Sequence, residues 1–179
     1  MGIVSRRAGN RSRGFTLIEL LVVLVLVGIV AGLAVLAIGD PAERQLQREI
    51  ERLQTVLELA RDEAMIAGGS ERALGLRADG YSLLELRVLD DRRREWAAVN
   101  DRLLGQRELD ASLFEISLEQ GGRRIPLSLA GSWEPHVGIG DTGEMTPALI
   151  GLKLRTRGAQ QRFLQIAFEG RLEVLHERP

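Results

Sequence analysis

The chain contains no cysteine, a single lysine, and aromatic side chains at only 4% of its residues. The absence of cysteine excludes disulfides, thiolate nucleophiles and cysteine-ligated zinc. Because aromatic residues are so few, a hydrophobic core must be built mainly from aliphatic side chains. The two histidines, His136 and His176, are isolated from one another. No phosphate-binding loop, dinucleotide-binding motif or serine-nucleophile motif occurs, so we expect neither a cofactor nor an enzyme activity.

The distribution of charge argues against bulk nucleic-acid binding. The formal net charge is -1, but residues 1–14 carry four arginines and no acidic residue. The rest of the chain has 20 basic against 25 acidic side chains. Binding to a phosphate backbone rests on lysine and arginine, so a mildly acidic chain is poorly suited to it. We expect no nucleic acid among the partners.

The apolar run at residues 15–38 contains one charged residue, Glu19. As an α-helix this run would extend roughly 36 Å, and the hydrocarbon core of a bilayer is about 30 Å thick. Four arginines precede the run, and the next basic residue is Arg44. The positive-inside rule therefore keeps the N-terminus in the cytoplasm. We predict a single transmembrane helix at residues 15–38, with the remaining chain on the far side of the membrane.

Glu19 is an unusual residue for such a helix. A carboxylate near the centre of a membrane helix costs on the order of 2.5–3.5 kcal/mol and usually has a partner. The apolar run supplies no basic residue for this purpose. A plain signal-anchor would explain the apolar length and the arginines, but not this carboxylate. Cleavage after Gly14 would create a cation, the new α-amine of Phe15, which Glu19 of a neighbouring molecule could meet.

The segment from Arg13 to Leu20, RGFTLIEL, resembles the class III signal of type IV pilins and type II secretion pseudopilins. The resemblance implies that residues 1–14 are a leader, that a prepilin peptidase cuts after Gly14, and that Phe15 becomes N-methylated. It also implies that Glu19 pairs with the Phe15 amine of an adjacent subunit during assembly. The expected location is then the bacterial inner membrane, with the head in the periplasm.

Residues 39–69 are predicted to continue the helix beyond the membrane. Gly39-Asp40-Pro41 should kink or interrupt the helix, and Gly68-Gly69 should end it. Between these points apolar residues recur at spacings of four and three, which is typical of an amphipathic helix. The stripe contains Leu46, Ile50, Leu53, Leu57, Ala60 and Ala64. A coiled coil is one interpretation, but the short stripe favours packing against a sheet of the same chain.

Residues 70–179 are predicted to form a β-rich head, because the apolar period changes from helical spacing to two. Glycine-containing turns at Asp79-Gly80, Gly121-Gly122, Gly158 and Gly170 separate the strands. The expected strands cover residues 73–78, 81–89, 95–99, 113–119, 125–130, 149–157, 162–168 and 171–176. The fold class is therefore α+β and pilin-like: a long N-terminal helix packed on one of two small antiparallel sheets.

Residues 131–148 are predicted to form a long loop with short strand pieces. The part from Gly140 to Pro147, with the strand that follows, resembles the H-type minor pseudopilins of type II secretion systems. This resemblance implies a structural subunit near the tip of a periplasmic pseudopilus. The implied partners are the other minor pseudopilins and the major pseudopilin. A membrane-anchored enzyme is disfavoured, because no catalytic constellation is present.

The alternative is a minor type IV pilin that acts in DNA uptake or adhesion. Its supporting feature is the alternation of Lys153, Arg155 and Arg157, which would share one face of a strand, with Arg162 expected across the hairpin from them. A solvated strand face is the simpler interpretation of the same residues.

Calcium is the metal to consider as a ligand, because some pseudopilins of other types bind it. The possible ligands are Asp90, Asp91 and Asp101 in one region and Asp141 and Glu144 in another. Arginines directly follow Asp91 and would oppose a cation. We therefore expect no metal site.

Overall fold

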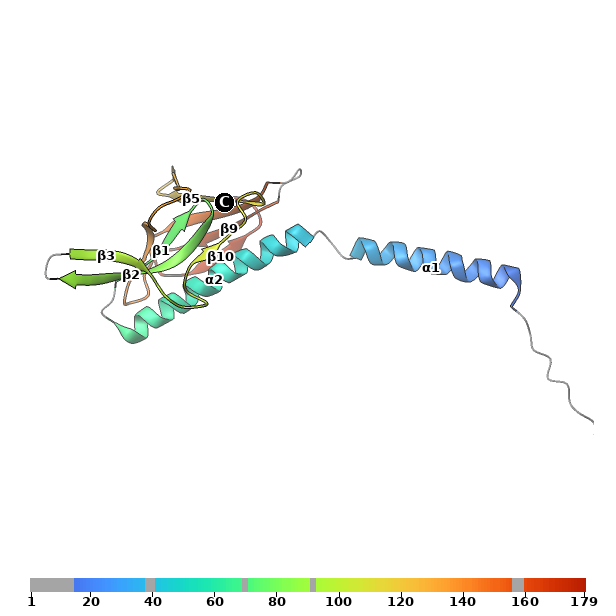
Figure 1. Ribbon diagram of the computed structural model, residues 1–179, viewed down its shortest axis with the longest axis horizontal. Coiled ribbons are helices and arrows are strands. Elements are labelled where there is room, and N and C mark those ends of the chain that lie inside the picture. The colour runs from blue at the N-terminus through green and yellow to red at the C-terminus, as the bar shows by residue number, and fades with distance from the viewer. Residues whose placement is uncertain (1–14, 38–40, 69–70, 91–92, 156–159) are drawn as a thin grey trace, which may run out of the picture. The chain divides into compact units, whose positions relative to one another are not determined.

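The computed structural model describes residues 15–37, 41–68, 71–90, 93–155 and 160–179 (Figure 1). The chain divides into two compact units, residues 1–39 and residues 40–179. The first unit contains helix α1 (Leu17–Ala37), and the second contains helix α2 (Pro41–Ala67) and all of the strands.

Helix α1 is apolar apart from Glu19 in its first turn. The side chains described along it, from Phe15 onward, are exposed. Within the described residues, no helix combines the length and the apolar character that a membrane crossing needs. The prediction of a transmembrane helix at residues 15–38 is therefore not confirmed by the structure, and it stays a prediction.

Helix α2 begins at Pro41, a residue favoured at the first helical position because its missing N–H would have no partner there. The predicted apolar stripe is confirmed, since all six of its members are buried in the core. The helix ends at Ala67, and Gly68 follows it: its φ of 57° and the bond of its amide to the Ala64 carbonyl form a left-handed C-terminal cap. A residue with a Cβ would be strained in this conformation, which is why glycine stops the helix here.

In the described part of the head, the strands form two five-stranded sheets, and every pairing is antiparallel. Sheet A has the order β3 (Arg93–Ala98), β2 (Gly80–Asp90), β1 (Arg72–Arg77) and β7 (Pro135–Ile139), with β4 (Arg107–Glu108) paired to β2. Sheet B has the order β10 (Leu172–Leu175), β9 (Gln161–Ile166), β8 (Ala148–Leu154), β5 (Phe114–Gln120) and β6 (Arg123–Ile125).

The core lies between α2 and the inner faces of the sheets. Helix α2 packs mainly on β8, β9 and β10 of sheet B, and it also contacts β1 and β7 of sheet A. The buried cluster is aliphatic, as predicted, and its aromatic members are Tyr81 and Phe114. The predicted α+β, pilin-like fold class is confirmed.

Several predicted strand ends were wrong. The strand expected at residues 125–130 is the short β6, because Pro126 has no N–H to donate to a ladder. The two-residue strand β4 was not predicted. Residues 131–148 contain β7, which pairs with β1 rather than standing alone. The strand expected at 149–157 ends at Leu154, and Gly158 and Arg157 lie outside the described residues.

Candidate functional site: the start of helix α1 and the surface of the head

The start of α1 carries two of the three residues predicted for processing and assembly. Gly14 lies outside the described residues, whereas Phe15 is 72% exposed and Glu19 is also exposed. Thr16 precedes the helix and caps it: the amide of Glu19 donates a hydrogen bond to Thr16 Oγ1 at 3.3 Å. The structure thus places the carboxylate of Glu19 on the third residue of the helix.

The capping geometry supplies a second reason for a carboxylate at position 19, one that the sequence interpretation missed. Thr16-Leu17-Ile18-Glu19 has the spacing of a capping box, in which the third helical residue is glutamate or glutamine. A negative charge in the first turn also interacts favourably with the helix dipole. Within the described part of the chain, the Glu19 carboxylate makes no ion pair, so it is available to a cation from outside.

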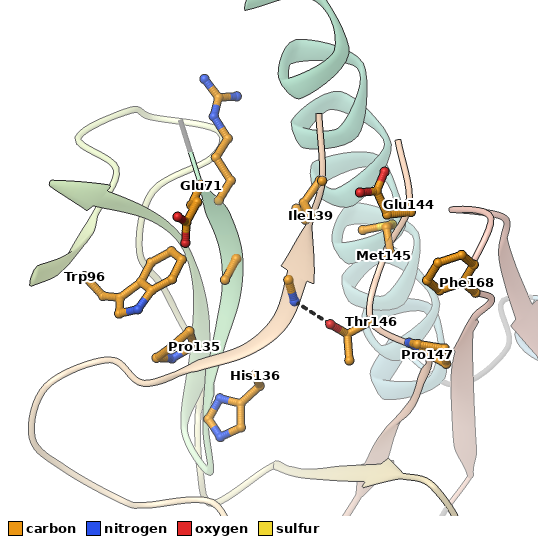
Figure 2. Close-up of a pocket in the computed structure, with 14 residues that line it drawn as sticks. Glu71, Trp96, Pro135, His136, Ile139, Glu144, Met145, Thr146, Pro147 and Phe168 are labelled. Carbon is orange, nitrogen blue, oxygen red and sulfur yellow. Dashed lines mark hydrogen bonds between the residues drawn. The ribbon is translucent and has the colours of Figure 1, made fainter. Parts of the chain in front are cut away.

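On the head, a groove of about 450 Å³ runs along β7. Figure 2 shows Trp96 and Phe168 on opposite sides of this strand, with Ile139 and Met145 between them. Thr146 is hydrogen-bonded to β7: its Oγ1 accepts a hydrogen bond from the Gly138 amide at 3.0 Å, drawn as the dashed line. The lining is largely apolar, and its polar side chains are those of Glu71, Arg72, His136, Glu144 and Thr146.

His136 is half-buried in the wall of this groove. Val137 pairs with Leu74 and Pro135 with Gly75, so His136 is an extra residue in the ladder. Its Nδ1 accepts the hydrogen bond of the Leu76 amide at 3.2 Å. Burial lowers the pKa of His136, while Glu134 acts weakly in the opposite direction. The imidazole is therefore a structural acceptor in its neutral form.

The acidic residues considered as calcium ligands are dispersed, or their carboxylates already accept hydrogen bonds from the chain. The carboxylate of Asp101 accepts hydrogen bonds from the amides of Leu103 and Leu104, at 2.7 and 2.9 Å, and these bonds lower its pKa. Glu144 accepts a hydrogen bond from the Thr142 hydroxyl, which lowers the Glu144 pKa. Asp91 lies outside the described residues. Among the residues described, no three His, Cys, Asp or Glu side chains gather as metal ligands would.

The predicted basic stripe is only partly present. Lys153 and Arg155 are exposed, but the Arg155 guanidinium donates a hydrogen bond to the Phe114 carbonyl. Arg162 was expected across the hairpin from Lys153, and this was wrong: Lys153 pairs with Gln161, and Arg162 faces α2, where it bonds Glu43. A shift of one residue in the register reverses the face on which a side chain lies.

Comparisons with known proteins agree with the resemblance of residues 13–20 to the pilin signal and with that of residues 140–147 to the H-type minor pseudopilins. A family model described as a prokaryotic N-terminal methylation motif matches residues 9–35. Type II secretion system protein H of Pseudomonas aeruginosa is 34% identical over 173 residues, which cover 89% of this chain and 92% of that protein. The chain belongs to the type II secretion system protein H family. The prediction of the H type is thereby confirmed.

A further relative and two solved structures are also similar to this chain. Type II secretion system protein H of Dickeya chrysanthemi is 27% identical over 181 residues, covering 93% of this chain and 97% of that protein. The minor pseudopilin EpsH of Vibrio cholerae has a TM-score of 0.55 at 19% identity, covering 76% of this chain and 98% of that one. The solution structure of Escherichia coli GspH has a TM-score of 0.56 at 18% identity, over 77% and 93%. These structures share the fold of the H-type head.

Proposed function

We propose that the chain is a minor pseudopilin, a structural and non-catalytic subunit near the tip of the periplasmic pseudopilus of a type II secretion system. Membership of the protein H family and the pilin-like head support this role. Its partners would be the other minor pseudopilins, the major pseudopilin and the prepilin peptidase.

The proposed maturation starts from an inner-membrane precursor. Residues 15–38 cross the membrane with the N-terminus in the cytoplasm and the head in the periplasm. The prepilin peptidase removes residues 1–14 by cutting after Gly14, and Phe15 is then N-methylated. The match of the methylation-motif model to residues 9–35, which include Gly14, Phe15 and Glu19, supports this sequence of events.

Assembly rests on one observation, the exposed Glu19 carboxylate in the first turn of an apolar helix. In a low-dielectric surrounding an unpaired carboxylate is unfavourable, and a cation at hydrogen-bond distance stabilises it strongly. The α-amine of Phe15 on a neighbouring subunit is such a cation. Pairing of the two groups would set the axial position of one subunit against the next while their apolar helices bundle.

Glutamine at position 19 separates this pairing from helix capping. Glu19→Gln retains a residue that suits a capping box but removes the charge. We expect the variant to insert and to be processed normally, and to enter pseudopili at least about tenfold less, which corresponds to a loss of roughly 1.4 kcal/mol. Cross-linking of the subunit to its neighbours in intact cells measures incorporation.

Glu177→Ala is the matched control, because Glu177 is an exposed carboxylate in the C-terminal tail. This variant should assemble as well as the unmodified chain. If Glu19→Gln also assembles at the normal level, the carboxylate acts only within its own helix and the intermolecular pairing is refuted.

Processing is tested at the predicted junction. Gly14→Leu should leave a longer precursor that retains the leader, because it places a bulky side chain directly at the proposed cut. Gly9→Leu, a change of another leader glycine, should be processed normally. Immunoblotting and N-terminal mass determination distinguish the two forms, and normal cleavage of Gly14→Leu would contradict the proposed cut.

The role in secretion is tested against the alternative role in DNA uptake. A strain without the protein should lose exoprotein secretion and retain transformation and twitching. Loss of transformation with intact secretion would favour the minor type IV pilin. Arg162 bonds Glu43 of α2 and so does not extend the basic face of Lys153 and Arg155 on which that alternative rests.

A further inference from the structure

The exposed side of α2 carries its charges in an order that does not suit an isolated helix. Exposed side chains recur at helical spacing on the side opposite the buried stripe, and together they form the outer ridge of α2: Arg44, Arg48, Glu51, Thr55, Asp62 and Ile66. The two arginines come first, near the N-terminal end, and the acidic residues follow them. The helix dipole favours the opposite order, with acidic residues near the N-terminus and basic residues near the C-terminus.

The two arginines of the ridge have no counter-charge in the chain. Arg44 and Arg48 are one turn apart, so their like charges repel each other. Within the residues that the structure describes, neither guanidinium has a hydrogen-bond or ion-pair partner. The nearest carboxylates along the helix are bonded elsewhere: that of Glu43 to an arginine of β9 at 3.2 Å, and that of Glu51 to the Gln47 amide at 2.7 Å. A direct pair between Arg48 and Glu51 on this exposed surface would be weak in any case.

The chain itself limits how far these arginines can lie from the apolar run. The run ends at residue 38, and α2 begins at Pro41. Residues 38–41 span at most about 11 Å, and the helix then rises about 1.5 Å per residue, so the Cα atoms of Arg44 and Arg48 lie at most about 15 and 21 Å from the end of the run. Side chains of a helix lean toward its N-terminus, so both guanidinium groups lean toward the start of α2. A bilayer that the run crosses has its headgroup layer within reach of them.

We propose that Arg44 and Arg48 bind phosphate groups of lipid headgroups at the periplasmic surface of the inner membrane, and so hold the start of α2 at the bilayer before assembly. This rests on the proposed membrane crossing of residues 15–38. A guanidinium group binds phosphate oxygens through two parallel hydrogen bonds, which matches the free donors of both residues.

Two observations favour lipid over an acidic partner protein and define the contact. The apolar run keeps lipid phosphates close to both arginines at a high effective concentration, which a separate protein would have to supply by binding. A helix that lies flat on a membrane carries basic residues along its whole polar face. The outer ridge carries Glu51 and Asp62 instead, and phosphates would repel these carboxylates. Only the first turns of α2 therefore approach the surface.

The test measures how fast phenylglyoxal, a reagent for accessible guanidinium groups, modifies each arginine of the full chain, with peptide mass spectrometry as the readout. The chain is held in nonionic detergent micelles, in nanodiscs of phosphatidylglycerol and phosphatidylcholine, or in nanodiscs of a phosphate-free galactolipid. We expect Arg44 and Arg48 to react about fivefold more slowly in the phospholipid discs than in micelles, the effect of an arginine held at an anionic surface. Most of this protection should disappear in the galactolipid discs and at about 0.5 M salt.

Two controls separate phosphate binding from simple shielding by the disc. Arg123 is the matched control within the same molecule, because it is an exposed arginine of β6 in sheet B, and it should react at about the same rate in micelles and discs. Arg48→Glu places a negative charge one turn from Arg44. Arg44 should then lose its protection, whereas shielding by the disc would preserve it. Circular dichroism checks that the variant is folded.

The proposal is overturned if Arg44 and Arg48 react as fast in phospholipid discs as in micelles, if Arg123 is protected equally, or if the protection survives in galactolipid discs. Protection that appears only when other minor pseudopilins are added would identify a protein as the occupant and overturn it as well. A chain that does not enter the discs contradicts the proposed membrane crossing and this proposal together. A chain that enters the discs with unprotected arginines contradicts the lipid contact alone.

Discussion

An ion pair between Glu49 on α2 and Arg107 on β4 joins the helix to sheet A. The side chain of Glu49 is 8% exposed and that of Arg107 is 37% exposed. The guanidinium meets the carboxylate with two groups, Nη2 and Nε, the latter at 3.2 Å. Tyr81 lies beside the pair, and its pKa is raised to about 12 by burial and by the charge of Glu49.

Arg107→Ala would leave the Glu49 carboxylate buried without its cation. Breaking a fully buried pair in this way costs about 3–5 kcal/mol. Because Arg107 is partly exposed, water can reach the vacated side, and we expect about 2–3 kcal/mol. For a head of this size that corresponds to a fall in Tm of about 4–12 °C. Near-ultraviolet circular dichroism of Tyr81 and the two tryptophans follows the unfolding of the head.

A double-mutant cycle gives the decisive control. Glu49→Gln removes the charge that Arg107 compensates, so adding Arg107→Ala to it should cost about 1 kcal/mol or less. Additive effects of the two substitutions, or a loss under about 0.5 kcal/mol for Arg107→Ala alone, would refute the claim that the carboxylate depends on this arginine. Arg44→Ala, at an exposed position of the same helix, should change Tm by no more than about 2 °C.

Two further predictions concern a turn and a histidine. Gly170 has a φ of 76°, and a Cβ there would overlap the Gly143 carbonyl oxygen, so Gly170→Ala should lower the free energy of unfolding by about 2–4 kcal/mol in chemical denaturation. Since the folded pKa of His136 lies below its ordinary value of 6.5, the stability it contributes is present above pH 6.5 and is lost as the pH falls through the folded pKa. Thermal melts between pH 7.5 and 5 measure this loss, and His136→Gln should reduce it.

Each of these two predictions has its own comparison. Gly121 has a φ of 55° with open space around it, so Gly121→Ala should cost only about 1–2 kcal/mol, the strain of the backbone alone. Equal losses for the two glycines would show that the contact with Gly143 is unimportant. For the histidine, His176→Gln is the comparison, because His176 is exposed. An unchanged pH dependence in His136→Gln would exclude His136 as its source.

Elements with a strong local pattern could be predicted from the sequence. The apolar stripe of α2 is one example, because helical spacing places Leu46, Ile50 and Leu57 on one side whatever they pack against. The tight connection at Gly121-Gly122 is another: both residues have positive φ, which only glycine adopts readily, and the strands on either side pair directly. The methylation motif that covers residues 9–35 is likewise a local pattern, whereas the cut after Gly14 and the pairing of Glu19 stay predictions.

Features that depend on pairing between distant segments could not be predicted in the same way. β4 has two residues and no periodicity, and it is a strand only because Gly80 and Tyr81 lie opposite it. His136 became a hydrogen-bond acceptor because the ladder between β1 and β7 contains an extra residue. The capping box at Thr16 is different, because its pattern was present in the sequence and was overlooked in favour of an intermolecular partner for Glu19.

The sequence by itself determined the N-terminal methylation motif, the amphipathic helix and the alternation of strands and turns, because each depends on residues a few positions apart. Only the tertiary structure decided which charges meet. Glu49 and Arg107 are 58 residues apart, and one residue of register placed Gln161 rather than Arg162 beside Lys153. Side chains alternate between the faces of a strand, so a shift of one position exchanges core for surface.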